Sequence, residues 1–93
     1  MQSGPIFPEN ELIQRAQQRI DDGRLPLVLP SLISAGYGTA GTRCAVCDLD
    51  ILPDQVLYEI DDPRAVEELI AFHFGCYVIW QRECAQRLGY PNK

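Results

Sequence analysis

Two short motifs place four potential metal ligands in the chain as two pairs. Cys44 and Cys47 are separated by two residues, and so are His73 and Cys76. A tight turn can aim both sulfurs of the first pair at one ion, and residues three apart at the start of a helix share a face. Three thiolates and one imidazole suit Zn²⁺ in a closed tetrahedral site. The sequence therefore predicts one structural zinc ion bound by these four residues.

The fourth cysteine lies outside this set. Cys84 follows Cys76 on a segment expected to be helical, and their spacing corresponds to about 12 Å along a helix axis. Zinc–sulfur bonds are about 2.3 Å long, so one straight helix cannot bring both sulfurs to one ion. We expect Cys84 to be a small buried hydrophobic residue, with a reactive thiol as the alternative.

Two other uses of the cysteine pair are disfavoured. A dithiol redox motif normally opens a helix in a βαβ unit, and no such pattern surrounds Cys44. A catalytic zinc needs an open position, and four protein ligands leave none. Catalysis becomes plausible only if Cys44 or His73 does not bind and Asp48 or Asp50 enters the shell. We therefore expect no catalytic residues and no enzymatic activity.

Composition and charge narrow the function classes. The chain has 93 residues, is 46% hydrophobic and carries a formal net charge of −5. A chain this short buries a modest core and gains from a metal as a staple. Phosphate backbones require clustered Lys and Arg, and only Arg64 interrupts an acidic run of Asp48, Asp50, Asp54, Glu59, Asp61, Asp62, Glu67 and Glu68. This disfavours nucleic acid, unless Arg15, Arg19, Arg82 and Arg87 converge in space.

No membrane or secretory pattern is recognisable. The first ten residues contain two prolines and an acid in place of a basic and then apolar leader. The longest apolar stretch, from Leu25 to Ala35, is interrupted by Pro26 and Pro30 and is about half the length that a bilayer requires. We expect a cytoplasmic protein with reduced thiols and no membrane partner.

The first third of the chain is expected to be an arm, a helix and a connector. We expect an arm over residues 1–8 and a helix that begins at Glu9 and is stopped by Gly23. Its apolar stripe packs on the protein's own core or, alternatively, binds a partner; it consists of Leu12, Ile13, Ala16 and Ile20.

Residues 24–43 are expected to form an irregular connector, because they are rich in glycine and proline. The run from Gly36 to Gly41 matches G-x-G-x-x-G, but it leads into the Cys44 turn. A dinucleotide fingerprint must follow a buried strand and open a helix. We therefore interpret these glycines as turn-forming.

Residues 44–89 are expected to form the zinc-binding unit of a single α+β domain, residues 9–93. A strand is predicted over Gln55–Ile60, with Val56, Tyr58 and Ile60 on one face. After a turn at residues 61–64, either a second hairpin strand covers 68–74 or a short helical turn covers 65–70. A helix then covers 75–88 and ends at Gly89, with an apolar stripe of Cys76, Ile79, Trp80, Cys84 and Leu88.

This order of elements resembles a known class of zinc finger. A Cys-x2-Cys turn, a hairpin and a His-x2-Cys pair that opens a helix are similar to treble-clef fingers. The string from Phe72 to Tyr77 resembles the middle of a LIM finger, although the 25-residue gap between the pairs is longer and a second zinc site is missing. Residues 19–88, with Trp80 after the last ligand, look more like a group of small uncharacterised bacterial zinc-binding proteins. The resemblance implies a zinc-stapled, treble-clef-like unit and no particular activity.

The leading functional hypothesis is a small cytosolic zinc-binding protein that acts as a protein-interaction or regulatory module. One alternative is a nucleic-acid-binding zinc finger. Another is a redox or zinc-responsive switch, in which thiolate oxidation ejects the metal and unfolds the module. The identity of a protein partner and the oligomeric state do not follow from these motifs.

Overall fold

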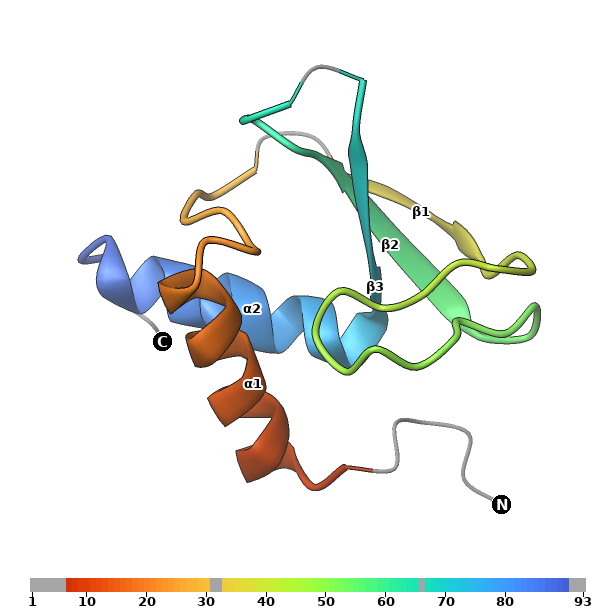
Figure 1. Ribbon diagram of the computed structural model, residues 1–93, viewed down its shortest axis with the longest axis horizontal. Helices are drawn as coiled ribbons and strands as arrows, with labels where there is room; N and C mark the ends of the chain where they lie inside the picture. Colours follow the sequence, from red (N-terminus) through yellow and green to blue (C-terminus); the bar gives the residue numbers. More distant parts are fainter. Residues whose placement is uncertain (1–6, 31–32, 66, 91–93) are drawn as a thin grey trace.

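Two helices and a three-stranded antiparallel sheet make up the fold (Figure 1). The computed structural model describes residues 7–30, 33–65 and 67–90. The elements follow in the order α1 (Glu9–Asp21), β1 (Ile33–Tyr37), β2 (Val56–Asp61), β3 (Leu69–His73) and α2 (Phe74–Arg87). The strand order in the sheet is β1-β2-β3. This confirms the predicted α+β class.

Both helices end where a glycine reverses the chain. Gly23 after α1 and Gly89 after α2 have φ angles of +82° and +86°, a region that glycine adopts at little cost. The helices therefore stop within one or two residues of their predicted ends. Leu88 does not join the buried stripe of α2 as expected, because the helix ends at Arg87 and leaves Leu88 exposed.

The connector predicted to be irregular contains the edge strand β1, so that part of the prediction is wrong. Tyr37 lies opposite Val56 and Ile33 opposite Ile60 in an antiparallel ladder with β2. The sequence alternates apolar residues here, but Gly36 and the glycines and prolines on either side obscure the pattern. Strand formation depends on pairing with a segment much farther along the chain, which local propensity does not describe.

The second half of the sheet follows the hairpin alternative. β2 begins and ends one residue later than predicted, and β3 lies within the predicted strand 68–74. The helical turn considered for residues 65–70 is wrong. The Glu68 N–H donates to the Ala65 carbonyl in a turn, at 3.2 Å, and Leu69 already belongs to β3. The longer antiparallel ladder offers these residues more hydrogen bonds than one helical turn can.

The core lies between the sheet and α2, and α1 packs on α2 (Figure 1). Phe72 of β3 stacks on Trp80 of α2, with ring centroids 5.1 Å apart, and Tyr58 of β2 lies 5.2 Å from Tyr77. Tyr58 and Ile60 therefore lie on the same face of β2, as predicted. Val56, the first residue of the strand, is exposed. In the part of the chain that the structure describes, neither helix has the length and apolar character needed to cross a bilayer.

Candidate metal centre

The first ligand pair lies on a tight loop, residues 43–50, that we call the knuckle loop. The Asp48 N–H donates to the Cys44 carbonyl at 3.0 Å, and the Cys44 N–H donates to the Leu49 carbonyl at 2.9 Å. Asp48 has a φ angle of +67°, a left-handed conformation that aspartate tolerates better than most residues. The loop therefore reverses the chain directly after Cys47 and leaves both sulfurs on its inner side.

The second pair lies at the junction of β3 and α2. His73 is the last residue of β3 and the N-cap of α2, and Cys76 follows in the first helical turn. The Ala45 N–H donates to the Ala71 carbonyl at 2.9 Å, which attaches the knuckle loop to β3. This hydrogen bond brings the two pairs into one cluster.

The four donor atoms have the arrangement that one metal ion requires. Cys44, Cys47, His73 and Cys76 are all buried, and their ligand atoms all lie within 4.8 Å of one another. The Cys47 Sγ and the His73 Nδ1 are 3.4 Å apart. With bonds of about 2.3 Å to sulfur and 2.0–2.1 Å to nitrogen, a tetrahedral ion would separate these two atoms by about 3.5 Å. The site therefore fits a single metal ion.

Groups around the ligands orient two of them. The His73 Nε2 lies 3.1 Å from the Gln55 Oε1, so the ring donates its Nε2–H there and directs its Nδ1 toward the ligand cluster. The Leu52 N–H also donates to the Gln55 Oε1, at 2.8 Å. The Cys44 Sγ accepts N–H groups from Val46 and His73, each at 3.5 Å. Hydrogen bonds to a sulfur stabilise its thiolate form.

Gln55 was not identified from the sequence. It lies two residues before Leu57, which is paired with His73 across the β2–β3 ladder. Alternate residues of an extended chain share a face, so the ladder register alone indicates that Gln55 lies near His73. No local sequence pattern carries this information.

The closely packed sulfur and imidazole groups shift the pKa values of three of the four residues. Hydrogen bonds from the Cys47 and Cys76 thiols place the pKa of Cys44 far below its usual range. The pKa of Cys76 is strongly raised, chiefly because its thiol donates to Cys44. Contact with the Cys44 and Cys47 sulfurs raises the pKa of His73 to about 10. A metal ion would displace the remaining protons, since it binds thiolates and neutral imidazole.

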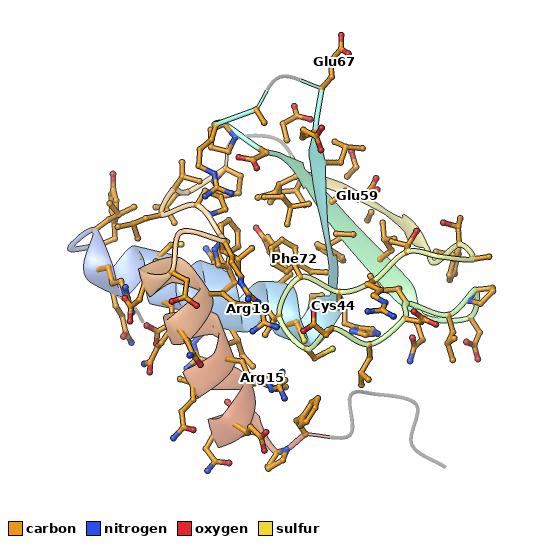
Figure 2. The ribbon with its side chains drawn as sticks, viewed as in Figure 1. Arg15, Arg19, Cys44, Glu59, Glu67 and Phe72 are labelled. Carbon is orange, nitrogen blue, oxygen red and sulfur yellow. The ribbon has the colours of Figure 1, made fainter. Side chains whose placement is uncertain are left out.

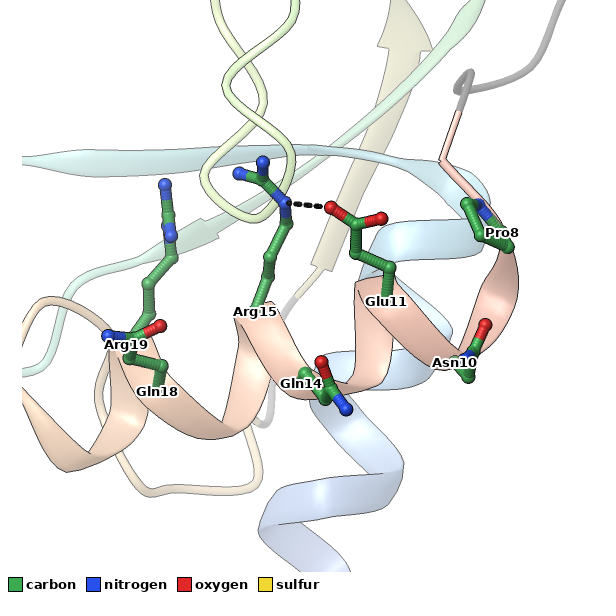
Figure 3. Close-up of a pocket in the computed structure, with 7 residues that line it drawn as sticks. All are labelled: Pro8, Asn10, Glu11, Gln14, Arg15, Gln18 and Arg19. Carbon is green, nitrogen blue, oxygen red and sulfur yellow. Dashed lines mark ion pairs between the residues drawn. The ribbon is translucent and has the colours of Figure 1, made fainter.

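An ion pair connects the knuckle loop to α1. The Arg19 guanidinium donates to the Asp48 carboxylate, and Figure 2 shows Arg19 pointing from α1 toward the loop that carries Cys44. The Arg19 side chain is largely buried although it carries a charge. A polar groove runs along the same helix (Figure 3), lined by Pro8, Asn10, Glu11, Gln14, Arg15, Gln18 and Arg19. In it, the Arg15 Nε lies 3.7 Å from the Glu11 carboxylate.

The apolar stripe of α1 faces the protein's own interior. Leu12, Ala16 and Ile20 are buried in the core, and Ile13 is half-buried against it. This is the first of the two arrangements expected from the sequence. The stripe proposed for partner binding is therefore largely covered by α2.

Most of the described arginines form ion pairs with carboxylates. Arg19 and Arg87 pair with Asp48 and Asp21, while the other acids with an arginine partner are Asp50, Asp62, Glu11 and Glu83. Arg64 also donates to the Gly23 and Arg24 carbonyls. Within the described ranges, no cationic side chain pairs with Asp54, Glu59, Asp61, Glu67 or Glu68. The sheet and its loops therefore carry an excess of negative charge.

Cys84 lies apart from the cluster. It is fully buried, and its Sγ lies 3.5 Å from the Pro26 carbonyl, which also accepts the Trp80 Nε1–H at 3.1 Å. Burial raises the pKa of this thiol. Cys84 is thus a core residue that helps to hold the 24–30 segment on α2.

No family model, curated protein or solved structure matches this chain. The chemistry of the site therefore rests on its own residues: four buried donor atoms that can hold one metal ion.

Proposed function

We propose that the metal is zinc and that it stabilises a small cytoplasmic module whose role is to bind another protein. Zinc is favoured by the donor set, because three sulfurs and one nitrogen are soft or borderline ligands that suit a tetrahedral ion. The order of knuckle loop, hairpin and ligand-bearing helix start is the order in treble-clef fingers.

The observation that carries a structural rather than catalytic role is the closure of the site. All four donors are buried side chains of the chain itself, so a tetrahedral ion would have no position for water or substrate. His73, the chain's one histidine, is both a candidate ligand and hydrogen-bonded to Gln55. It is therefore not available to shuttle protons. These features support a protein that is not an enzyme.

The charge distribution supports a protein rather than a nucleic acid as partner. Of the four arginines that could have formed a basic surface, Arg15, Arg19 and Arg87 each pair with a carboxylate, and among the described residues only Arg82 of this set has no ion pair. Phosphate binding requires several free cationic groups close together. Exposed apolar side chains are present as well, and Tyr37, Leu69 and Phe74 are each more than half exposed. Such residues are common in protein interfaces.

The zinc part of the proposal is tested by native mass spectrometry. We expect one zinc ion per chain in the wild type and in Cys84→Ala, and none in Cys76→Ser. Both variants remove one buried sulfur, but only Cys76 belongs to the cluster. Retention of zinc by Cys76→Ser would contradict the ligand set.

The binding role is tested by quantitative capture from a native lysate. Wild type, Cys84→Ala and chelator-treated wild type serve as baits, and we expect one partner to be retained stoichiometrically by the first two only. A parallel anisotropy titration with duplex and single-stranded oligonucleotides near physiological salt should show no saturable binding. A specific oligonucleotide complex, or the same retention after chelation, would overturn the proposal.

A further inference from the structure

The outer edge of β1 offers backbone hydrogen-bonding groups that have no partner in the part of the chain that the structure describes. The Gly38 N–H donates to the Gln55 carbonyl at 3.1 Å, in the same register as the β1–β2 ladder. Bonded pairs alternate along an antiparallel ladder, so Ser34 and Gly36 bond to β2, and Ile33, Ala35 and Tyr37 direct their N–H and C=O groups outward. Among the described residues, no backbone group pairs with this outward set. β1 can therefore accept a further strand.

One face of this edge is apolar. Ala35 lies opposite Tyr58, and Tyr58 contacts α2, so the β1 residues of this face extend the core side of the sheet. α2 contacts β2 and β3 and, within the described chain, does not reach β1. We call the exposed apolar side chains here the apolar shelf. It consists of Ile33, Ala35, Tyr37 and Val56 of the sheet and of Phe74 at the start of α2, whose ring lies 5.2 Å from that of Tyr58. Tyr37 is 69% exposed and Phe74 53%.

On the other face of the same edge, β1 contributes only small residues, and the neighbouring strand β2 contributes acidic ones. β1 contributes only Ser34 and Gly36 to this face, and Ser34 lies opposite Glu59 of β2. Asp61 is on the same face, two residues farther along β2. Neither carboxylate pairs with a cation among the described residues. Neighbouring strands are about 4.8 Å apart, so a long basic side chain on an added strand could pass over Ser34 and Gly36 to reach Glu59.

We propose that β1 binds an extended basic segment of a partner protein as a fourth strand of the sheet. The inference rests on the proposed binding role and names the surface and the chemistry of the partner. The segment pairs its backbone with Ile33, Ala35 and Tyr37, places apolar side chains on the apolar shelf, and directs Arg or Lys side chains toward Glu59 and Asp61. Backbone pairing provides affinity, and the alternation of apolar and basic residues provides specificity.

The same features disfavour a second copy of this chain as the occupant. β1 contains no basic residue, so a paired β1 could not neutralise Glu59 or Asp61. Each copy carries a formal net charge of −5, and like charges oppose association.

The test uses a fluorescein-labelled seven-residue peptide that alternates Arg and Val, capped at both ends, in an anisotropy titration with the zinc-loaded protein. In the proposed register the valine amides face β1 and the arginine amides face away. N-methylation of the valine amides should therefore weaken binding by more than about tenfold, because several hydrogen bonds are lost. N-methylation of the arginine amides is the matched control and should leave binding within about threefold.

Two variants of the protein test the same surface. Ala35→Pro removes an outward N–H that β2 does not use, so the edge strand tolerates it, and binding should fall by more than about tenfold. Glu59→Gln should weaken binding by about two- to fivefold and reduce its dependence on salt. Both variants should keep the zinc content and melting temperature of the wild type.

Three results would overturn the inference: no saturable binding of the peptide, equal binding by Ala35→Pro, or a dimer that Ala35→Pro disperses. The capture experiment separates this failure from that of the binding role. If Ala35→Pro retains the lysate partner as well as the wild type does, the edge is not the binding surface but the role stands. If the wild type retains no partner, the role itself fails.

Discussion

Replacement of Gln55 by methionine should loosen the metal site without changing any of its four ligands. The Gln55 side chain accepts the Nε2–H of His73 at 3.1 Å and so holds the ring with its Nδ1 toward the cysteines. Methionine has a similar length and volume but no comparable acceptor. The imidazole would keep its position in the chain and lose the group that sets its tautomer and orientation.

The expected magnitude follows from burial of the ring. His73 is 5% exposed, so the unpaired N–H would find little water, and an unsatisfied buried donor costs about 1–3 kcal/mol. That range corresponds to a loss of roughly 5- to 150-fold in metal affinity, and removal of comparable outer groups costs about 10–100-fold. The Leu52 N–H also loses its acceptor, but Leu52 lies half exposed and its N–H can turn to water.

Zinc competition against a chromogenic chelator would measure this effect, with Gln55→Glu as the matched control. A glutamate can accept both the His73 and the Leu52 hydrogen bonds and should bind zinc at least as tightly as glutamine does. Tetrahedral cobalt(II) substituted for zinc would report the ligand geometry through its absorption bands. If Gln55→Met binds zinc within about twofold of the wild type, the proposed orienting role of Gln55 is refuted.

Three further predictions concern the metal, pH and the loop that leads to the site. Cys76→Ser should abolish the cooperative thermal transition, because metal-binding energy is folding energy in such domains, whereas Cys84→Ala should keep zinc and cost about 1–2 kcal/mol by calorimetry. Apparent zinc affinity should fall as pH decreases from 8 to 6, by about tenfold per unit for each proton displaced. The sign follows because the pKa of His73 is raised to about 10 in the metal-free site, so the metal must expel a proton throughout this range; a pH-independent affinity would contradict this. Gly38→Ala should destabilise the protein in urea titrations by about 1–3 kcal/mol, because a methyl group there would collide with backbone oxygens of the loop after the knuckle. Gly36→Ala is the control and should change stability by less than about 1 kcal/mol, since open space surrounds that position.

The parts of the fold that were predictable are those governed by near neighbours in sequence. The ligand pairs follow from spacings of three residues, and α2 follows from apolar residues that recur at helical intervals before Gly89. β2 was recognisable because its side chains alternate. In each case the geometry of a few consecutive residues decides the outcome, and those residues can be read directly.

The residues that surround the metal ligands could not be predicted in this way. Gln55 meets His73 only because of the β2–β3 register, and Asp48 meets Arg19 only because α1 packs near the knuckle loop. Neither pairing has a local signal, since each joins segments far apart in the chain.

The sequence by itself determined which residues are available as metal ligands and which segments favour helix or strand. Only the tertiary structure decided that the connector supplies an edge strand, that α1 uses its apolar stripe internally, and that the outer edge of β1 beside Glu59 has no backbone partner among the described residues. The physical reason is that ligand spacing and helical periodicity are local properties of the backbone. Strand register and helix packing depend instead on the summed contacts of distant segments, which no single stretch of residues specifies.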